Sequence, residues 1–270
     1  MIKDITLGQF FPGNSILHRA DPGAKILLTI LYIVDVFLAD SLLSYLILLL
    51  FSAALVLTAR ISFKTVLKSM KPLVIVIAFT SILNIFWTQG EDLLFSAGPV
   101  TVYAEGVIFA LKMVVRITTL LVGTTVLLTY TTSPIMLTDG LERILNPLKL
   151  IHVPVHEFSL MMTIALRFIP TLIEETDKIM SAQKARGADF SSGSLVNRAK
   201  ALVPVLIPLF ISSFRRADEL ATAMECRCYH GDDGRTKMTQ SKPTRVDLFL
   251  FLIICAVGAA IIAVNKLEIL

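Results

Sequence analysis

Hydrophobic side chains gather in five long runs along the chain, separated by shorter polar segments. The runs cover Ile26–Ala39, Leu42–Ala59, Leu73–Trp87, Gly106–Leu128 and Leu248–Val264. A helix needs about 20 apolar residues to cross the hydrocarbon core of a bilayer, so the fourth run is long enough and the others need flanking turns. The pattern predicts an all-α integral membrane protein with about five transmembrane helices.

The first run is the weakest, because Asp35 lies inside it and no Gly or Pro marks its end at Asp40-Ser41. Residues 26–59 could therefore form one long tilted helix or two helices. Lys and Arg accumulate on the cytoplasmic side of membrane proteins. Here they precede the first run and recur after the second, while none occurs between Val34 and Ala59. Two crossings before Arg60 satisfy this distribution, with the amino terminus in the cytoplasm and the carboxyl terminus outside.

This topology divides the chain into three parts. Residues 1–130 form a membrane domain with four spans, residues 131–246 a cytoplasmic helical segment, and residues 247–270 the last span. Within the middle part, Ser133-Pro134 starts a helix that ends near Leu145.

Two longer helices follow in the middle part, one from Val155 to Ala185 and one from Ser194 to a residue before Gly231. Pro170 is expected to bend the first, and Gly187 is a natural residue to end it. Each helix is apolar in its first half and charged in its second. That division suits a helix whose apolar part contacts the membrane or another subunit while its charged part projects into water.

Composition agrees with a membrane protein and excludes several other classes. The 270 residues are 55% hydrophobic and 17% charged, which is too apolar for a soluble domain. The first residues lack the apolar core of a cleavable signal peptide. Three cysteines, Cys226, Cys228 and Cys255, offer no disulfide framework and fit a reducing compartment. The formal charge of +4 is unevenly placed, which bears on topology and gives no indication of nucleic acid binding.

The sequence motifs of common enzymes are missing from the chain. It contains no GxxxxGK[ST] phosphate loop, so it cannot itself hydrolyse ATP in the P-loop manner, and no HExxH or GxSxG motif. We therefore expect neither an enzyme nor a bound cofactor.

Lys112 and Arg116 lie four residues apart on one face of the fourth span, and cations inside a membrane often mark functional sites. They could line the path of a self-sufficient channel or secondary carrier, which would transport without partners. Alternatively, they pair with Asp35 or Glu105, or extend toward the membrane surface. The second interpretation is favoured, because no neighbouring residue completes a transport path.

Cys226, Cys228 and His230 could supply three ligands to a soft metal, as in a membrane enzyme. A fourth ligand is missing, and two residues spaced by two on a helix point to different faces. The cysteines are more simply interpreted as small side chains, and we expect no metal site.

Two arginines at helix ends are the sharpest signal in the chain. Ala185-Arg186-Gly187 and Cys226-Arg227-Cys228 each place a guanidinium between two small residues. Small neighbours allow close approach of a partner, and the guanidinium can then bond to its carboxylates or backbone carbonyls. A basic residue at a helix carboxyl end is also favoured by the helix dipole. Two such ends in one segment favour partner binding.

Several motifs together resemble the transmembrane T component of energy-coupling factor (ECF) transporters, the family that includes the cobalt-transporter protein CbiQ. They lie at residues 8–25, 160–170, 182–187, 216–220 and 223–231, and include Asp21-Pro22-x-x-Lys25, Arg167-Phe168-Ile169-Pro170, Arg216-Ala217-Asp218-Glu219-Leu220 and Ala223-Met224-Glu225.

The resemblance implies a non-catalytic scaffold of an importer for a vitamin-type substrate. Its partners would be two ABC-type ATPase subunits and a separate substrate-binding membrane subunit, with lipid around the spans. The ATPase-docking residues would be Ala185, Arg186, Gly187, Glu225, Cys226, Arg227 and Cys228. The family usually has Ala-Arg-Gly at the second triplet also, so Cys226 and Cys228 depart from its pattern. The substrate would be recognised by another chain and cannot be inferred from this one.

Overall fold

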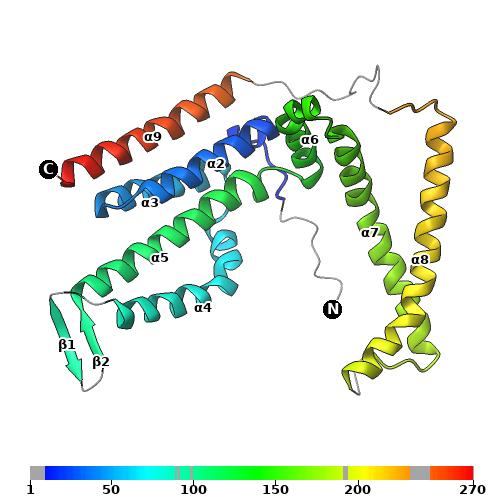
Figure 1. Cartoon of the computed structure of the whole chain (residues 1–270), viewed down its shortest axis with the longest axis horizontal. Coiled ribbons are helices and arrows are strands. Elements are labelled where there is room, and N and C mark those ends of the chain that lie inside the picture. Colours follow the sequence, from blue (N-terminus) through cyan, green and yellow to red (C-terminus); the bar gives the residue numbers. More distant parts are fainter. Residues whose placement is uncertain are drawn as a thin grey trace. The chain divides into compact units, whose positions relative to one another are not determined.

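The computed structural model describes residues 10–88, 90, 92–97, 100–190, 194–231 and 244–269. These residues form two compact units (Figure 1). The first, called here the membrane unit, holds the described residues up to Leu141 and those from Thr244 onward. The second, called the α7–α8 unit, holds the described residues from Glu142 to Gly231.

The membrane unit consists of helices and one small hairpin. Its elements are α1 (Ile16–Arg19), α2 (Pro22–Leu38), α3 (Leu42–Ala59), α4 (Phe63–Trp87), β1 (Leu93–Ala97), β2 (Val100–Tyr103), α5 (Ala104–Thr124), the π-helical turn η1 (Thr125–Tyr130), most of α6 (Pro134–Leu145) and α9 (Arg245–Ile269).

Residues 26–59 form two helices, as the charge distribution predicts. Asp21 caps the amino end of α2 through a hydrogen bond from the Ala24 backbone N–H, with Pro22 in the first turn. The chain leaves the helical conformation at Ala39, and the Ser41 side chain then caps α3. A side-chain cap therefore marks the boundary, although Gly and Pro are absent from it.

The structure differs from the sequence prediction at the third run. Helix α4 begins at Phe63, ten residues before the predicted start at Leu73, and contains Pro72. Lys64, Lys68 and Lys71 thus lie on the helix and not in a loop. The antiparallel hairpin of β1 and β2 also follows α4, where no strand was predicted.

Five helical segments of the described residues are long and apolar enough to cross a membrane, which confirms the predicted fold class. They are Leu42–Ala59, Phe63–Trp87, Ala104–Tyr130, Val196–Glu225 and Arg245–Leu267. These five segments are not the same five that the sequence predicted. Helix α2 has 17 residues, and Val196–Glu225, predicted to be cytoplasmic, passes by length and composition.

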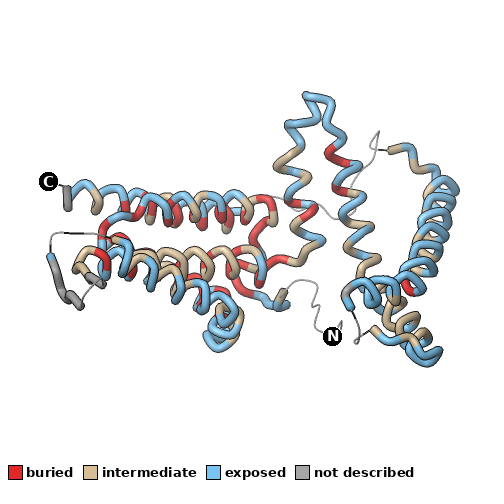
Figure 2. The backbone as a smooth tube through the Cα atoms, turned by 60° about the horizontal axis from the view of Figure 1, so that its bottom comes forward, coloured by how far each residue is buried: buried red, intermediate tan, exposed pale blue. Residues whose placement is uncertain are grey.

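The core of the membrane unit lies where α2, α3, η1 and α9 meet, around Tyr32 and Tyr130, both fully buried. The Tyr32 hydroxyl donates to the carbonyl of Thr119 at 2.7 Å. Gly123 lets α2 and α5 approach here, because a methyl group at that position would overlap the Tyr32 ring. Buried positions, red in Figure 2, lie on the facing sides of these helices, while the outer sides carry exposed apolar residues that suit contact with lipid.

The α7–α8 unit contains the turn η2 (Asn146–Ile151) and two helices of 31 residues each, α7 (Val155–Ala185) and α8 (Leu195–Glu225). Ser194 caps α8 by accepting a hydrogen bond from the Asn197 backbone N–H. Few of their residues are buried (Figure 2). The structure confirms two long helices at these predicted positions.

Candidate functional site

Helix α7 ends in a hydrogen-bonded cap built around Arg186. The N–H of Gly187 donates to the carbonyl of Lys184, and the N–H of Ala188 donates to that of Gln183, each at 3.0 Å. Gly187 adopts a φ of +89°, in the left-handed region. Two such hydrogen bonds around a left-handed residue form the Schellman motif. Glycine is preferred at the left-handed position because it has no Cβ. Arg186 is the last residue before the left-handed position.

Helix α8 ends in the same motif, with Cys228 in the place of glycine. The N–H of Cys228 donates to the carbonyl of Glu225 at 2.9 Å, and the N–H of Tyr229 donates to that of Met224 at 3.1 Å. Cys228 has a φ of +54°. Arg227 therefore occupies the position that Arg186 occupies in α7.

All seven predicted docking residues are exposed at these two ends. Within the described part of the chain, the guanidinium groups of Arg186 and Arg227 form no hydrogen bond or ion pair; only their backbone N–H groups are bonded, inside the caps. The helix carboxyl ends are satisfied by backbone N–H groups, so the two guanidinium groups are available to a partner.

The two arginine ends point in opposite directions along an antiparallel pair of helices. Glu175 of α7 pairs with Arg216 of α8 at 2.7 Å, and the side chain of Gln183 donates to the carbonyl of Pro204 at 3.4 Å. Residue numbers thus rise along α7 while they fall along α8, as the opposed course of the ribbons in Figure 1 also shows.

The Glu175–Arg216 ion pair lies midway between the two ends. Arg186 follows Glu175 by 11 residues, and Arg227 follows Arg216 by 11. At 1.5 Å per residue, each arginine lies about 16 Å from the ion pair, on opposite sides of it. A hydrogen bond from Ser212 and the Arg216 guanidinium lower the pKa of Glu175, so its carboxylate keeps its charge at neutral pH. The arrangement places two like arginine-bearing helix ends well apart from each other.

The other candidate sites do not gain support from the structure. Among the residues that the structure describes, no group of three or more His, Cys, Asp or Glu side chains is placed to hold a metal, and Cys226 and Cys228 are free thiols.

Arg116 pairs neither with Asp35 nor with Glu105, the partners expected for it. It donates to the carbonyl of Ala39 at 2.8 Å and lies 3.7 Å from the carboxylate of Asp40. The Arg116 guanidinium is thus engaged in the loop between α2 and α3, because α5 brings it close to the end of α2.

The structure also reveals a buried polar cluster that sequence reasoning did not assign. The Lys25 side chain is 1% exposed and donates to the Thr131 carbonyl and the Thr132 hydroxyl, each at 3.0 Å. Asp247 accepts from the Asp21 backbone N–H at 2.8 Å, and both carboxylates act on the Lys25 charge. The cluster joins α2, α9 and the segment that leads into α6. In the sequence, only the Asp21-Pro22-x-x-Lys25 motif marks this cluster. The residue types in that motif do not by themselves indicate a buried lysine with distant partners.

A close backbone contact supports the same junction. Gly140 of α6 lies against the first turn of α2, where a Cβ on Gly140 would come within 2.7 Å of the Gly23 nitrogen. No larger residue fits without displacing α6 from α2.

Taken together, the apolar helices and the paired arginine ends define a class: a multi-pass membrane protein with two like helix ends, each carrying an exposed arginine. The family model of the cobalt transport protein CbiQ matches residues 13–238. The chain belongs to this family, as a non-catalytic transmembrane component of an energy-coupling factor transporter.

Relatives named "Energy-coupling factor transporter transmembrane protein EcfT" match nearly the whole chain. The protein of Ruminiclostridium cellulolyticum is 55% identical over 93% of each chain. That of Clostridium kluyveri is 52% identical over 98% of this chain and 97% of its own. That of Bacillus subtilis is 47% identical over 88% of this chain and 89% of its own. These matches confirm the family resemblance that the motifs indicated.

The left-handed backbone at Cys228 generates a prediction about helix stability. Cys228→Gly should stabilise the end of α8 by about 1 kcal/mol, because glycine adopts positive φ without steric cost. Cys226→Gly is the matched control: Cys226 is right-handed helical, so glycine there should destabilise by a similar amount. Amide hydrogen exchange over residues 220–231 measures both. Equal effects of the two changes would contradict the assigned cap.

The buried ammonium group generates a second prediction. Lys25→Met should destabilise the protein by about 3 kcal/mol, because it removes the donor to Thr131 and leaves two carboxylates without their cation. Thermal unfolding in detergent measures the loss. Lys68→Met is the control, since Lys68 is exposed on α4, and it should change stability little. Equal losses of stability in the two variants would show that the Lys25 contacts do not hold the membrane unit together.

Proposed function

We propose that this chain is the scaffold that connects a pair of ABC-type ATPase subunits to a separate substrate-binding membrane subunit in an importer of vitamin-type substrates. The observation that carries the proposal is the repetition of one cap, with an exposed arginine, at both ends of an antiparallel helix pair. Two equivalent docking points suit two equivalent partners.

Each arginine would dock on one ATPase subunit. Ala185, Gly187, Glu225, Cys226 and Cys228 border the two arginines and would form the surrounding contact. Because the arginines lie on opposite sides of the Glu175–Arg216 ion pair, ATP-driven closure of the ATPase pair would change the angle between α7 and α8. The scaffold thereby transmits motion without chemistry of its own.

The apolar halves of α7 and α8 would hold the substrate-binding subunit. Phe158 and Met161 of α7 and Phe210 and Phe214 of α8 are among their exposed apolar residues, with Phe214 67% exposed. Exposed apolar residues on this scale mark surfaces that another protein or lipid covers. A change in helix angle would then reorient the bound subunit in the membrane.

We further propose that α8 lies on the cytoplasmic side and does not cross the membrane, despite its length. Its uninterrupted uncharged stretch runs only from Ala201 to Phe214 and contains two prolines. That stretch is 14 residues long, against about 20 for a span. A crossing would also place Arg186 and Arg227 on opposite sides, because α7 and α8 are antiparallel. With residues 131–246 inside, the amino terminus is cytoplasmic and the carboxyl terminus outside.

The docking proposal predicts the effect of reversing the two charges. Arg186→Glu and Arg227→Glu together should abolish co-purification of the ATPase subunits and substrate uptake, because a docked arginine reversed in charge costs several kcal/mol. Each single change should weaken assembly. Arg186→Lys should retain part of it, since lysine keeps the charge and loses the planar fork.

Arg215→Glu serves as the matched control, because Arg215 is exposed on α8 and lies away from the helix end. It should leave assembly intact. Normal ATPase co-purification and uptake in the double variant would overturn the docking proposal.

The topology proposal predicts the labelling of the native thiols Cys226 and Cys228, both exposed. In a Cys255→Ser background, a membrane-impermeant maleimide should label inside-out vesicles and spare intact cells. Labelling should become weaker when the ATPases are bound, because docking covers the helix end. Efficient labelling of intact cells would place the end of α8 outside and refute the topology.

A further inference from the structure

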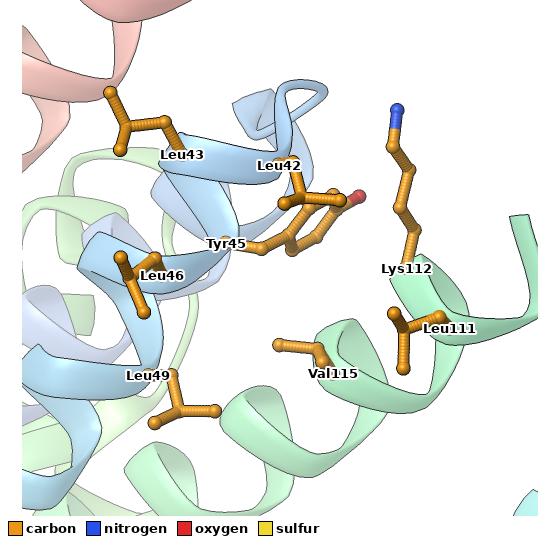
Figure 3. Close-up of a pocket in the computed structure, with 8 residues that line it drawn as sticks. All are labelled: Leu42, Leu43, Tyr45, Leu46, Leu49, Leu111, Lys112 and Val115. Carbon is orange, nitrogen blue, oxygen red and sulfur yellow. The ribbon is translucent and has the colours of Figure 1, made fainter. Parts of the chain in front are cut away.

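A groove lies between α3 and α5 of the membrane unit (Figure 3). It encloses a cavity of about 370 Å³. The lining residues are Leu42, Leu43, Tyr45, Leu46, Leu49, Leu111, Lys112 and Val115. Both helices are long and apolar enough to span a membrane, so the groove faces hydrocarbon when the protein is inserted.

Lys112 is the only charged residue among those that line this groove. Figure 3 shows its side chain extending away from Leu111, to the Leu42 end of the groove, with the ammonium group far from Leu49. None of the residues described in the structure forms a hydrogen bond or ion pair with the Lys112 ammonium group. An unpaired cation bordered by leucines in a membrane requires an anion or water near its end.

Arg116, the neighbouring cation on α5, is less suited than Lys112 to bind an added anion. Arg116, one turn further along α5, is already bonded to the Ala39 carbonyl and lies beside the Asp40 carboxylate. It also lies over the Tyr45 ring, 5.5 Å from the ring centroid. The Arg116–Asp40 pair is balanced in charge, which leaves the positive charge of Lys112 uncompensated at the end of an apolar groove.

We propose that this groove binds one anionic phospholipid, with an acyl chain along the leucines and the phosphate on Lys112. Charge and shape both match this ligand: a flexible apolar chain follows the groove from Leu49 to Leu42, and the headgroup arrives where the ammonium group lies. The size argues against a transmembrane helix of a partner as the occupant. A helix with its side chains is about 10 Å across and needs a broad face, whereas this cavity has the volume of a small-ligand pocket.

The test is native mass spectrometry of the purified full chain with equal amounts of phosphatidylglycerol and phosphatidylcholine. The wild type should bind the anionic lipid with about a ten-fold preference for the first molecule bound, as expected for one charge-assisted contact. Lys112→Gln should reduce the preference to near parity, and Lys112→Arg should retain it. Val115→Trp, which fills the groove, should reduce binding of the first lipid of either kind.

Lys266→Gln is the matched control, because it removes a lysine near the end of another membrane helix outside the groove. It should keep the full preference. An unchanged preference in Lys112→Gln, or an equal loss in Lys266→Gln, would overturn the proposal.

Two further outcomes would show that the groove holds something other than a lipid. If excess inorganic phosphate displaced the lipid, the site would recognise a free anion and the acyl chain would play no part. If a photo-crosslinker at Leu46 in the assembled transporter reacted with a protein subunit and not with lipid, the groove would be a protein interface. Either result refutes lipid binding while leaving the arginine docking proposal untouched.

Discussion

The buried ammonium group of Lys25 is the interaction on which the membrane unit depends. A charge in an apolar interior is tolerated only where hydrogen bonds and opposite charges surround it. Lys25 has both, from the Thr131 carbonyl, the Thr132 hydroxyl and the nearby carboxylates of Asp21 and Asp247. The donors and acceptors come from three distant parts of the chain. One side chain thereby fixes where α2 begins, where α9 enters and where the chain leaves η1 for α6.

This anchor lies at the point where force would have to pass. The π-helical turn η1 ends at Tyr130, one residue before the carbonyl that Lys25 holds, and Gly140 packs against the start of α2. π-Helical turns interrupt regular helices and often accompany functional sites. Held between Lys25 and Gly140, the start of α6 is attached to the membrane unit at two places. In the proposed scaffold, motion of α7 and α8 would reach the membrane unit through this fixed segment.

Much of the helical organisation could be predicted from the sequence, because local signals define helix ends. Ser133-Pro134, Ser194 and Gly187 are such signals, and α6, α7 and α8 begin or end beside them. The predicted start of α4 is wrong, since the third apolar run begins at Leu73 and the lysines before it are predicted to lie between two spans. A proline inside a helix removes one backbone hydrogen bond and bends the helix, but it does not have to end it, and α4 continues past Pro72. The Lys25 cluster could not be predicted, because Thr131, Thr132 and Asp247 lie more than 100 residues from Lys25 in the sequence.

The position of α8 shows why composition alone is insufficient. By length and composition, Val196–Glu225 passes as a possible span, although it is less apolar than α4. What separates α8 from α4 is its pairing with α7. Because Arg216 is bonded to Glu175, the charged middle of α7 lies beside α8 wherever α8 lies. A crossing would bring Glu174, Glu175, Asp177 and Lys178 into hydrocarbon with it, and most of these side chains are exposed or half-buried. A water-facing helix pair carries no such cost. The ion pair therefore favours one side of the membrane for both helices, and with it a common side for both arginine ends.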